Sequence, residues 1–118
     1  MRILLIVDDE PELEPLFRRF LRRDFDEIHF AGDAAAAEAV LSSVPVTHLV
    51  IDNALGRGSS PSGIDLIAGW RRAHPSIELA VLFTGAAPFS ESARPPEIDE
   101  VYIKPTGFEP LLAYLRQR

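Results

Sequence analysis

The sequence predicts an α/β domain, a doubly wound parallel sheet with helices on both faces. Two observations lead to this fold class. Short runs rich in Val, Ile and Leu recur along the chain, and such runs are typical of strands buried on both faces of a parallel sheet. Segments with apolar residues at helical spacing alternate with these runs. Five such strand–helix units within 118 residues imply helices on both sides of a single sheet.

The strands follow from the apolar runs, four of which stop on a polar residue. The predicted strands cover residues 3–7, 27–31, 47–52, 77–84 and 100–104. In a parallel sheet of this kind, ligands bind outside the carboxyl ends of the strands. The polar residues that end the runs are therefore the first candidates for a functional site.

The helices follow from stripes of apolar residues. Pro11 lies near the start of the first helix, Asp33 is the expected N-cap of the second, and Pro75 ends the third. The predicted helices cover residues 13–21, 34–43, 63–74 and 108–116. Between the last two strands, three prolines leave room for one short helix at most in residues 86–98.

Length and composition predict a single globular domain over residues 1–118. An apolar content of 47% and a charged content of 25% are typical of such domains. The chain has no Cys, which excludes disulfides and thiolate metal sites and fits a reducing compartment. The first apolar run is too short to span a membrane, and no signal-peptide cleavage site follows it, so we expect a cytoplasmic protein.

The net charge of −6 argues against non-specific binding to DNA or to an anionic membrane. One basic cluster lies at the carboxyl end of the first predicted helix and just after it, at Arg18, Arg19, Arg22 and Arg23. It has two interpretations. It is either a docking patch for an acidic partner or a solvated face whose cations lie near the carboxyl end of a helix, where the helix dipole favours them.

Adjacent acidic side chains end the first strand, at Asp8 and Asp9. Two neighbouring carboxylates repel each other unless a cation neutralises them, and hard oxygen ligands of this kind suit Mg²⁺. Acidic residues are also common at the start of a helix. The pair alone leaves both interpretations open.

A third carboxylate, Asp52, ends the third strand. A carboxylate at the end of a central strand is costly to bury unless it is paired. Close to a metal ion, it could act as a nucleophile toward a phosphodonor and form an acyl phosphate. A cap for the following loop is the alternative. Thr84 and Lys104 end the fourth and fifth strands, and a hydroxyl and an ammonium group can each bond a phosphoryl oxygen.

With these residues in this order, the chain resembles the receiver domain of bacterial two-component response regulators, the CheY-like family. The resemblance covers essentially the whole chain. It rests on IVDDE near the start, Asp52, Thr84-Gly85 and Lys104-Pro105. It implies a flavodoxin/CheY-like fold with the strand order 2-1-3-4-5.

By position, the resemblance makes Asp52 the phosphoryl acceptor, while Thr84 and Lys104 would bond the phosphoryl oxygens. It implies a Mg²⁺ site made of three carboxylates and one backbone oxygen: Asp8, Asp9, Asp52 and the carbonyl of Ala54. No enzymatic activity is expected beyond the Mg²⁺-dependent phosphorylation and dephosphorylation of the chain itself.

The resemblance also implies a stand-alone phosphoacceptor in a two-component phosphorelay. The phosphodonor would be a histidine kinase or a histidine phosphotransfer protein, and small donors such as acetyl phosphate serve some members of the family. The signal would pass to a downstream protein through protein–protein contacts, without a nucleic-acid or membrane partner. A phosphate sink or shuttle within a relay is a related interpretation.

The chain departs from the family pattern at three places. The loop from Asp52 to Gly63 is longer than usual and has Leu55-Gly56 where a Leu/Met-Pro pair is common. Val101 occupies the position of the usual switch aromatic, and Tyr102 is expected on the opposite face of the strand. The proline-rich segment 86–98 replaces a longer helix. The Leu-Gly-Arg-Gly sequence at 55–58, the Phe-Thr-Gly sequence at 83–85 and the missing switch aromatic are similar to those of the FATGUY type, a subgroup of single-domain receivers.

Two functions from other classes compete with this interpretation. A receiver-like interaction scaffold that is never phosphorylated would tend to lose one of the acceptor residues, and all of them are present. A flavodoxin-like or nucleotide-binding enzyme would need a Gly-rich phosphate cradle after the first strand. That turn is Asp-Asp-Glu-Pro instead.

Overall fold

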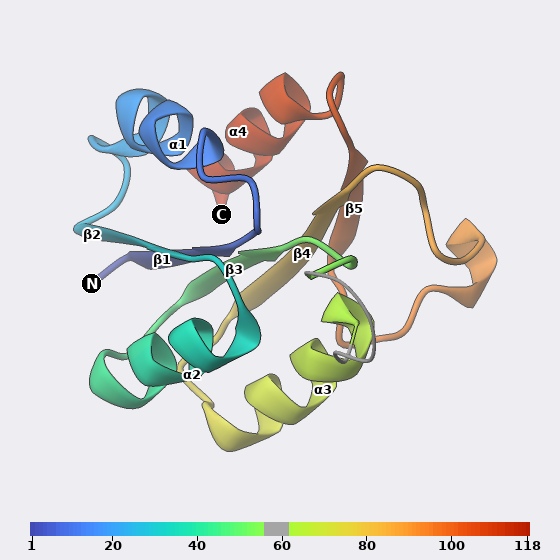
Figure 1. The fold of residues 1–118 in the computed structure, drawn as a ribbon, viewed down its shortest axis with the longest axis horizontal. Helices are drawn as coiled ribbons and strands as arrows, with labels where there is room; N and C mark the ends of the chain where they lie inside the picture. The colour runs from blue at the N-terminus through green and yellow to red at the C-terminus, as the bar shows by residue number, and fades with distance from the viewer. Residues whose placement is uncertain (56–61) are drawn as a thin grey trace.

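The computed structural model describes residues 1–55 and 62–118, without the side chain of Glu91. Five parallel strands form one sheet in the order β2-β1-β3-β4-β5, which confirms the predicted fold class and strand order (Figure 1). The strands are β1 (Ile3–Val7), β2 (Glu27–Ala31), β3 (His48–Ile51), β4 (Leu79–Thr84) and β5 (Glu100–Ile103). The sequence predicts a long loop after β3. Residues 56–61 of this loop lie outside the described part of the chain, so of the Leu55-Gly56 pair the structure describes Leu55 alone.

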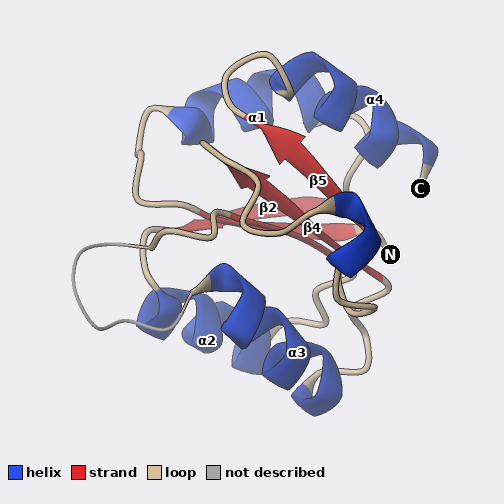
Figure 2. Ribbon diagram, turned by 90° about the vertical axis from the view of Figure 1, so that its right-hand side faces the viewer, coloured by secondary structure: helices blue, strands red, loops and turns tan. Residues whose placement is uncertain are grey.

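Helices cover both faces of the sheet. Figure 2 shows α1 and α4 on one face and α2 and α3 on the other. The helices are α1 (Leu13–Leu21), α2 (Ala34–Ser43), α3 (Gly63–Ala73) and α4 (Phe108–Gln117). Asp33 caps α2 as predicted, because its Oδ1 accepts the N–H of Ala36 at 2.8 Å. Among the described residues, no helix is both long enough and apolar enough to cross a membrane.

The fourth strand begins later than the sequence pattern predicts. The N–H of Ile77 donates to the carbonyl of His74 in a turn that follows α3, so this residue has not yet entered the sheet. Pairing with β3 starts at Leu79. Apolar character alone does not separate a buried turn residue from a strand residue.

The sheet separates two hydrophobic cores, because successive strand residues point to opposite faces. The core beneath α2 and α3 contains, from the strands, Ile3, Leu5, Val7, Ala31, Leu49, Ile51, Ala80 and Leu82. The core beneath α1 and α4 contains, from the strands, Leu4, Ile6, Ile28, Val50, Leu79, Val81 and Phe83. Both faces of the central strands are therefore buried, which explains their continuous apolar sequences.

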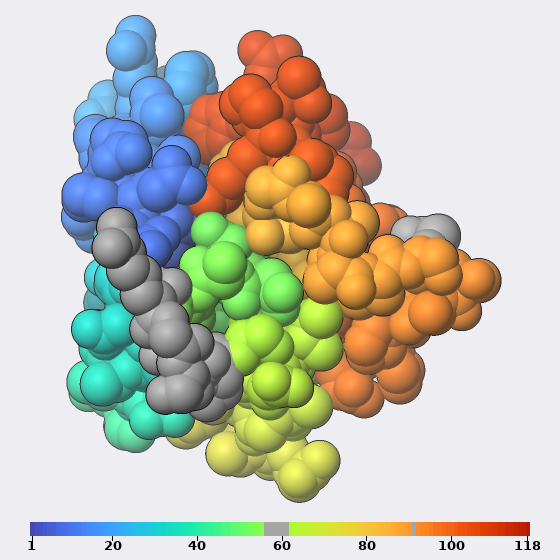
Figure 3. Space-filling model, turned by 45° about the vertical axis from the view of Figure 1, so that its right-hand side comes forward, coloured from blue at the N-terminus to red at the C-terminus, as the bar shows by residue number. Residues whose placement is uncertain are grey.

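The connection between β4 and β5 contains one short 3₁₀ helix, η1 (Glu91–Ala93), in agreement with the prediction for this proline-rich segment. Figures 1 and 3 show that the connection projects from the body of the protein. Its end is held by Asp99, whose Oδ2 accepts hydrogen bonds from the Arg71 guanidinium at 2.7 Å and the Ala80 N–H at 2.8 Å.

Neighbouring residues of β5 take part in different cores. Val101 packs against the α2–α3 core, whereas Tyr102 packs against the α1–α4 core, with its ring centroid 5.8 Å from that of Tyr114. The predicted placement of Tyr102 on the face opposite Val101 is confirmed.

Candidate phosphoryl-acceptor site

The carboxyl ends of four strands bring the predicted site residues together. Asp8 follows β1, Asp52 follows β3, Thr84 ends β4 and Lys104 follows β5. Because β1, β3, β4 and β5 are consecutive neighbours in the sheet, their ends meet along one edge. The sheet order therefore places the four side chains in one cluster.

Asp52 is the central residue of this cluster and is 7% exposed. Its Oδ1 accepts hydrogen bonds from the Thr84 hydroxyl at 2.8 Å and from the Ala54 N–H at 3.0 Å. Its Oδ2 accepts one from the Lys104 ammonium at 2.9 Å. Three donors thus fix one buried carboxylate, and they offset the cost of removing its charge from water.

Lys104 bridges three carboxylates. Besides Asp52, its Nζ donates to Asp8 Oδ2 at 2.8 Å and to Glu10 Oε1 at 2.6 Å. Burial on its own would lower the pKa of Lys104, but the hydrogen bonds to these carboxylates outweigh it and raise the pKa well above its ordinary value. The ammonium group therefore stays charged and neutralises part of the acidic cluster.

Asp8 is almost completely buried, at 2% exposure. Burial raises its pKa, and the hydrogen bonds from Lys104 and from the Glu10 N–H oppose that rise. The bond from the Glu10 N–H to Asp8 Oδ1 is 3.0 Å long and closes a tight turn directly after β1. This turn determines which of the following side chains enter the site.

A glycine lets α3 approach the backbone of the acceptor residue. A Cβ at Gly63 would lie 2.7 Å from the carbonyl oxygen of Asp52 and 3.0 Å from the Cα of Asn53. The Gly63 N–H donates to the Asn53 carbonyl at 3.0 Å, and the Ile64 N–H donates to the Asn53 side chain at 3.1 Å. The start of α3 therefore fixes the backbone that follows β3.

An open cleft gives the cluster access to solvent. The cleft has a volume of about 560 Å³ and is lined by Glu10, Asp52, Asn53, Ala54, Thr84, Gly85, Ala86, Ala87, Pro88 and Lys104. A Cβ at Gly85 would meet no other atom within 4 Å, so the backbone after β4 has free space beside it. A phosphoryl group can therefore reach the Asp52 carboxylate from this side.

The carboxylates suit a divalent cation. Single oxygens of Asp8, Glu10 and Asp52 all lie within 4.8 Å of one another, and hard oxygen ligands are those that Mg²⁺ and Ca²⁺ prefer. Asp9, which the sequence predicts as a ligand, is exposed and lies outside this group of three. Its role, like that of the Ala54 carbonyl, stays a prediction.

Glu10 is the residue of this cluster that the sequence interpretation missed. It is the third acidic residue in a row after β1, which was a usable signal. Spacing alone could not show which of three consecutive acidic side chains point into the site, because the turn after the strand decides their directions.

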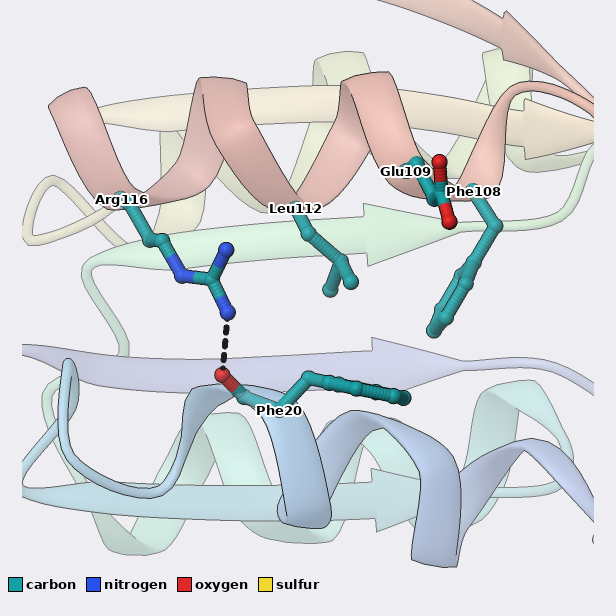
Figure 4. A pocket seen from close by; sticks show the side chains of 5 residues that line it. All are labelled: Phe20, Phe108, Glu109, Leu112 and Arg116. Atoms are coloured by element: carbon teal, nitrogen blue, oxygen red, sulfur yellow. Dashed lines mark hydrogen bonds between the residues drawn. The ribbon is translucent and has the colours of Figure 1, made fainter.

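A separate hollow lies between α1 and α4, with a volume of about 390 Å³ (Figure 4). It is lined by Phe20, Phe108, Glu109, Leu112 and Arg116. The Arg116 guanidinium donates to the carbonyl of Phe20 at 2.7 Å, so this cation is already engaged. The hollow lacks the converging carboxylates of the cleft, and we do not assign it a role in phosphoryl transfer.

Comparisons with known proteins support the fold. No protein-family model and no curated protein matches the chain, but many solved structures do. The signal receiver domain of an HD domain-containing protein from Pseudomonas fluorescens is 26% identical with a TM-score of 0.80, and the match covers 98% of this chain and 85% of that one.

Two further structures contain ions at a response regulator. The response regulator TrrA from Thermotoga maritima, in complex with Mg(2+)-BeF, is 21% identical with a TM-score of 0.79, over 99% of this chain and 98% of that one. A response regulator from Burkholderia pseudomallei, with a phosphorylated aspartic acid, a calcium ion and citrate, is 24% identical with a TM-score of 0.77. That match covers 98% of this chain and 66% of the Burkholderia chain. The chain therefore has the fold of response-regulator receiver domains, and the resemblance predicted from its motifs is confirmed.

Proposed function

We propose that this chain is a receiver domain that accepts a phosphoryl group on Asp52 within a two-component phosphorelay. One observation carries the proposal: a buried carboxylate at the edge of an open cleft is bonded by a hydroxyl, an ammonium and a backbone N–H. A buried carboxylate with a purely structural role also needs hydrogen-bond donors, but it does not need to line an open cleft. The donor is a histidine kinase or a histidine phosphotransfer protein.

The chemical step is a displacement at phosphorus. An oxygen of the Asp52 carboxylate forms a new O–P bond while the bond from phosphorus to the donor's imidazole nitrogen breaks. The leaving nitrogen keeps the electron pair and takes a proton from water. The product on the chain is an acyl phosphate.

Thr84 and Lys104 stabilise the charge of the transferred group. Both already donate to Asp52, so both lie within reach of oxygens on a phosphoryl group attached there. Donors that are held in place before the reaction cost no reorganisation during it. Fixed donors of this kind are a main source of catalysis in phosphoryl transfer.

The cation that we propose for the cleft is Mg²⁺. When bound, it neutralises charge on the phosphoryl group. Asp8 and Asp52 are the buried carboxylates suited to hold it. Asp9 and the carbonyl of Ala54 are the further ligands that the sequence resemblance implies.

We further propose that the protein acts in the cytoplasm through protein–protein contacts, without a nucleic-acid or membrane partner and without chemistry beyond its own phosphorylation and dephosphorylation. Phosphorylation adds charge and acceptor oxygens at the end of β3. Through Thr84, this change reaches β4 and the projecting connection before β5, which a downstream partner would contact.

The test is the intact mass of the protein after incubation with acetyl phosphate, with and without Mg²⁺. We expect the parent chain to gain one phosphoryl group when Mg²⁺ is present, and Asp52→Asn to gain none. Asp65→Asn is the matched control, because it removes an acidic group on α3 that does not line the cleft. It should gain phosphate like the parent.

Two results would contradict this function. An adduct that persists in Asp52→Asn would mean that another group accepts the phosphate. An absence of any adduct, even with a cognate kinase supplied, would favour the alternative of an interaction scaffold that is independent of phosphorylation.

A further inference from the structure

Glu10 and Lys104 form a wall between two cavities. Both residues line the open cleft that contains Asp52. Both also line a second cavity of about 220 Å³, whose remaining lining residues are Leu13, Leu16, Phe83, Pro105 and Phe108. The ion pair between Glu10 Oε1 and Lys104 Nζ, at 2.6 Å, therefore lies where the cleft that contains Asp52 adjoins an apolar cavity.

The three carboxylates that Lys104 contacts differ in how firmly they are fixed. Asp8 and Asp52 are buried and accept backbone N–H groups in addition to the ammonium. The Glu10 side chain is 45% exposed, and the described residues provide its carboxylate with one hydrogen-bond donor, Lys104. Among the three carboxylates, Glu10 is therefore the one for which Lys104 is the hydrogen-bond donor that the described residues provide.

We infer that Glu10 is a positioning residue that holds the Lys104 ammonium at the phosphoryl-acceptor site while Asp8 and Asp52 change partners. The inference rests on the proposed phosphorylation of Asp52. During that reaction one Asp52 oxygen becomes bonded to phosphorus, and Asp8 is free to bind a cation. The Lys104 bonds to both carboxylates are then weakened or lost, whereas the bond to Glu10 is not.

The surroundings of Lys104 make such an anchor necessary. Its Nζ lies 5.5 Å from the centroid of the Phe83 ring, on the apolar side of the wall. Apart from Lys104 itself, Glu10 supplies the one polar side chain among the residues that line the apolar cavity. Without Glu10, the ammonium would have no carboxylate to keep it beside the phosphoryl oxygens once the other two are engaged.

The test compares Glu10→Gln with the parent chain in two backgrounds. We expect Glu10→Gln to slow the gain of phosphate from acetyl phosphate about tenfold, since displacement of a catalytic group by a fraction of an ångström has effects of this size. In the Lys104→Met background, the same substitution should change the rate less than about twofold, because the effect of Glu10 passes through Lys104. Glu12→Gln removes an exposed acidic group nearby that caps no helix through its side chain, and it should behave like the parent.

Two measurements do not depend on phosphorylation. The affinity for Mg²⁺, measured by titration calorimetry, should fall much less than the phosphorylation rate in Glu10→Gln. A Glu10 oxygen lies close to those of Asp8 and Asp52, so its charge contributes to cation binding, but we assign its bond to the ammonium. The ammonium signal of Lys104 in nitrogen-15 NMR should be sharp in the parent, because three hydrogen bonds slow its exchange with water. With saturating Mg²⁺, which engages Asp8 and Asp52, we expect that signal to remain in the parent and to broaden or disappear in Glu10→Gln.

Three results would overturn the inference. A fall in the Mg²⁺ affinity of Glu10→Gln by the same factor as the phosphorylation rate would make Glu10 a cation ligand. An equal effect with and without Lys104 would show that Glu10 acts independently of it. An unchanged Lys104 signal would show that the ammonium is held without Glu10. If the parent itself gains no phosphate, the proposed function fails, and the Lys104 signal still decides whether Glu10 holds the ammonium.

Discussion

Buried polar groups lie at both edges of this sheet, but their partners differ. At the carboxyl edge, side chains from β1, β3, β4 and β5 bond mainly to one another and line an open cleft. At the amino edge, Thr47 bonds to the backbone of Ile3: its Oγ1 accepts the Ile3 N–H at 2.9 Å and lies 3.0 Å from the Ile3 carbonyl. His48 is buried beside Thr47, and its Nδ1 lies 2.7 Å from Thr47 Oγ1.

This difference separates a site that can exchange partners from one that cannot. Under the function that we propose, Lys104 would move from the Asp52 carboxylate to a phosphoryl oxygen, because Lys104 and Asp52 both line the cleft. The Thr47 bonds join β1 to the residue that precedes β3, and Thr47 and His48 are both buried. Burial of polar groups is therefore no sign of function unless their partners are exchangeable.

The largest expected effect comes from Lys104→Met, which tests whether the ammonium is an exchangeable counter-ion. In metal-free buffer, its loss leaves Asp8 and Asp52 buried without a cation, and we expect the free energy of unfolding to fall by about 3 kcal/mol. Mg²⁺ should restore much of this loss and stabilise the variant more than the parent. Urea denaturation with and without Mg²⁺ measures both effects.

Arg71→Met is the matched control for this prediction. It breaks the ion pair with Asp99, which lies at the other end of β4, away from the cleft. The loss of stability in this variant should be the same with and without Mg²⁺. An equal recovery in both variants would show that Mg²⁺ stabilises the protein through another site.

A smaller effect is expected from Thr47→Val at the amino edge. The substitution leaves the buried Ile3 N–H without its acceptor, which costs about 1–3 kcal/mol. The rate of phosphate gain from acetyl phosphate should not change, because no partner of Thr47 reaches the cleft. Thermal unfolding and intact mass measure the two properties. A large loss of phosphorylation in a folded Thr47→Val protein would contradict the division into a functional and a structural edge.

The smallest expected effect is a change in pH dependence from His48→Asn. Burial lowers the pKa of His48, and the charges of Arg2 and Glu78 act on it in opposite directions. Below the ordinary histidine pKa near 6.5, the unfolded chain binds a proton that the folded chain resists, so stability falls as the pH decreases. The contribution of this one proton is at most about 1.4 kcal/mol per pH unit.

We therefore expect the free energy of unfolding to fall less steeply between pH 7 and pH 5 in His48→Asn than in the parent, as urea denaturation at several pH values would show. Leu49→Val, in the same strand, is the control: it should lower stability equally at each pH. A slope that is the same in His48→Asn and the parent would mean that another group causes the pH dependence.

The fold could be predicted because its signals are local. Strands buried on both faces have continuous apolar sequences, and the amphipathic segments between them have helical spacing. Asp52, Thr84 and Lys104 could be proposed as one site because each lies at a strand end, and the ends of parallel strands meet at one edge. Exposure was harder to predict. Leu16 and Phe20 belong to the apolar stripe of α1 but are 39% and 42% exposed, because the width of the covered stripe depends on how α4 packs beside α1.

The sequence by itself determined the strands and the polar residues at their ends, since these depend on short apolar runs and on the residue that follows each. The order of the strands was predicted through the family resemblance that those residues carry, and the structure confirms it. The tertiary structure alone decided which acidic side chains meet Lys104. The turn closed by the Glu10 N–H and Asp8 Oδ1 is followed by a Glu10 side chain that bonds an ammonium group 94 residues away in the chain. No local pattern records that contact, because it exists only once β5 has been added to the sheet beside β4.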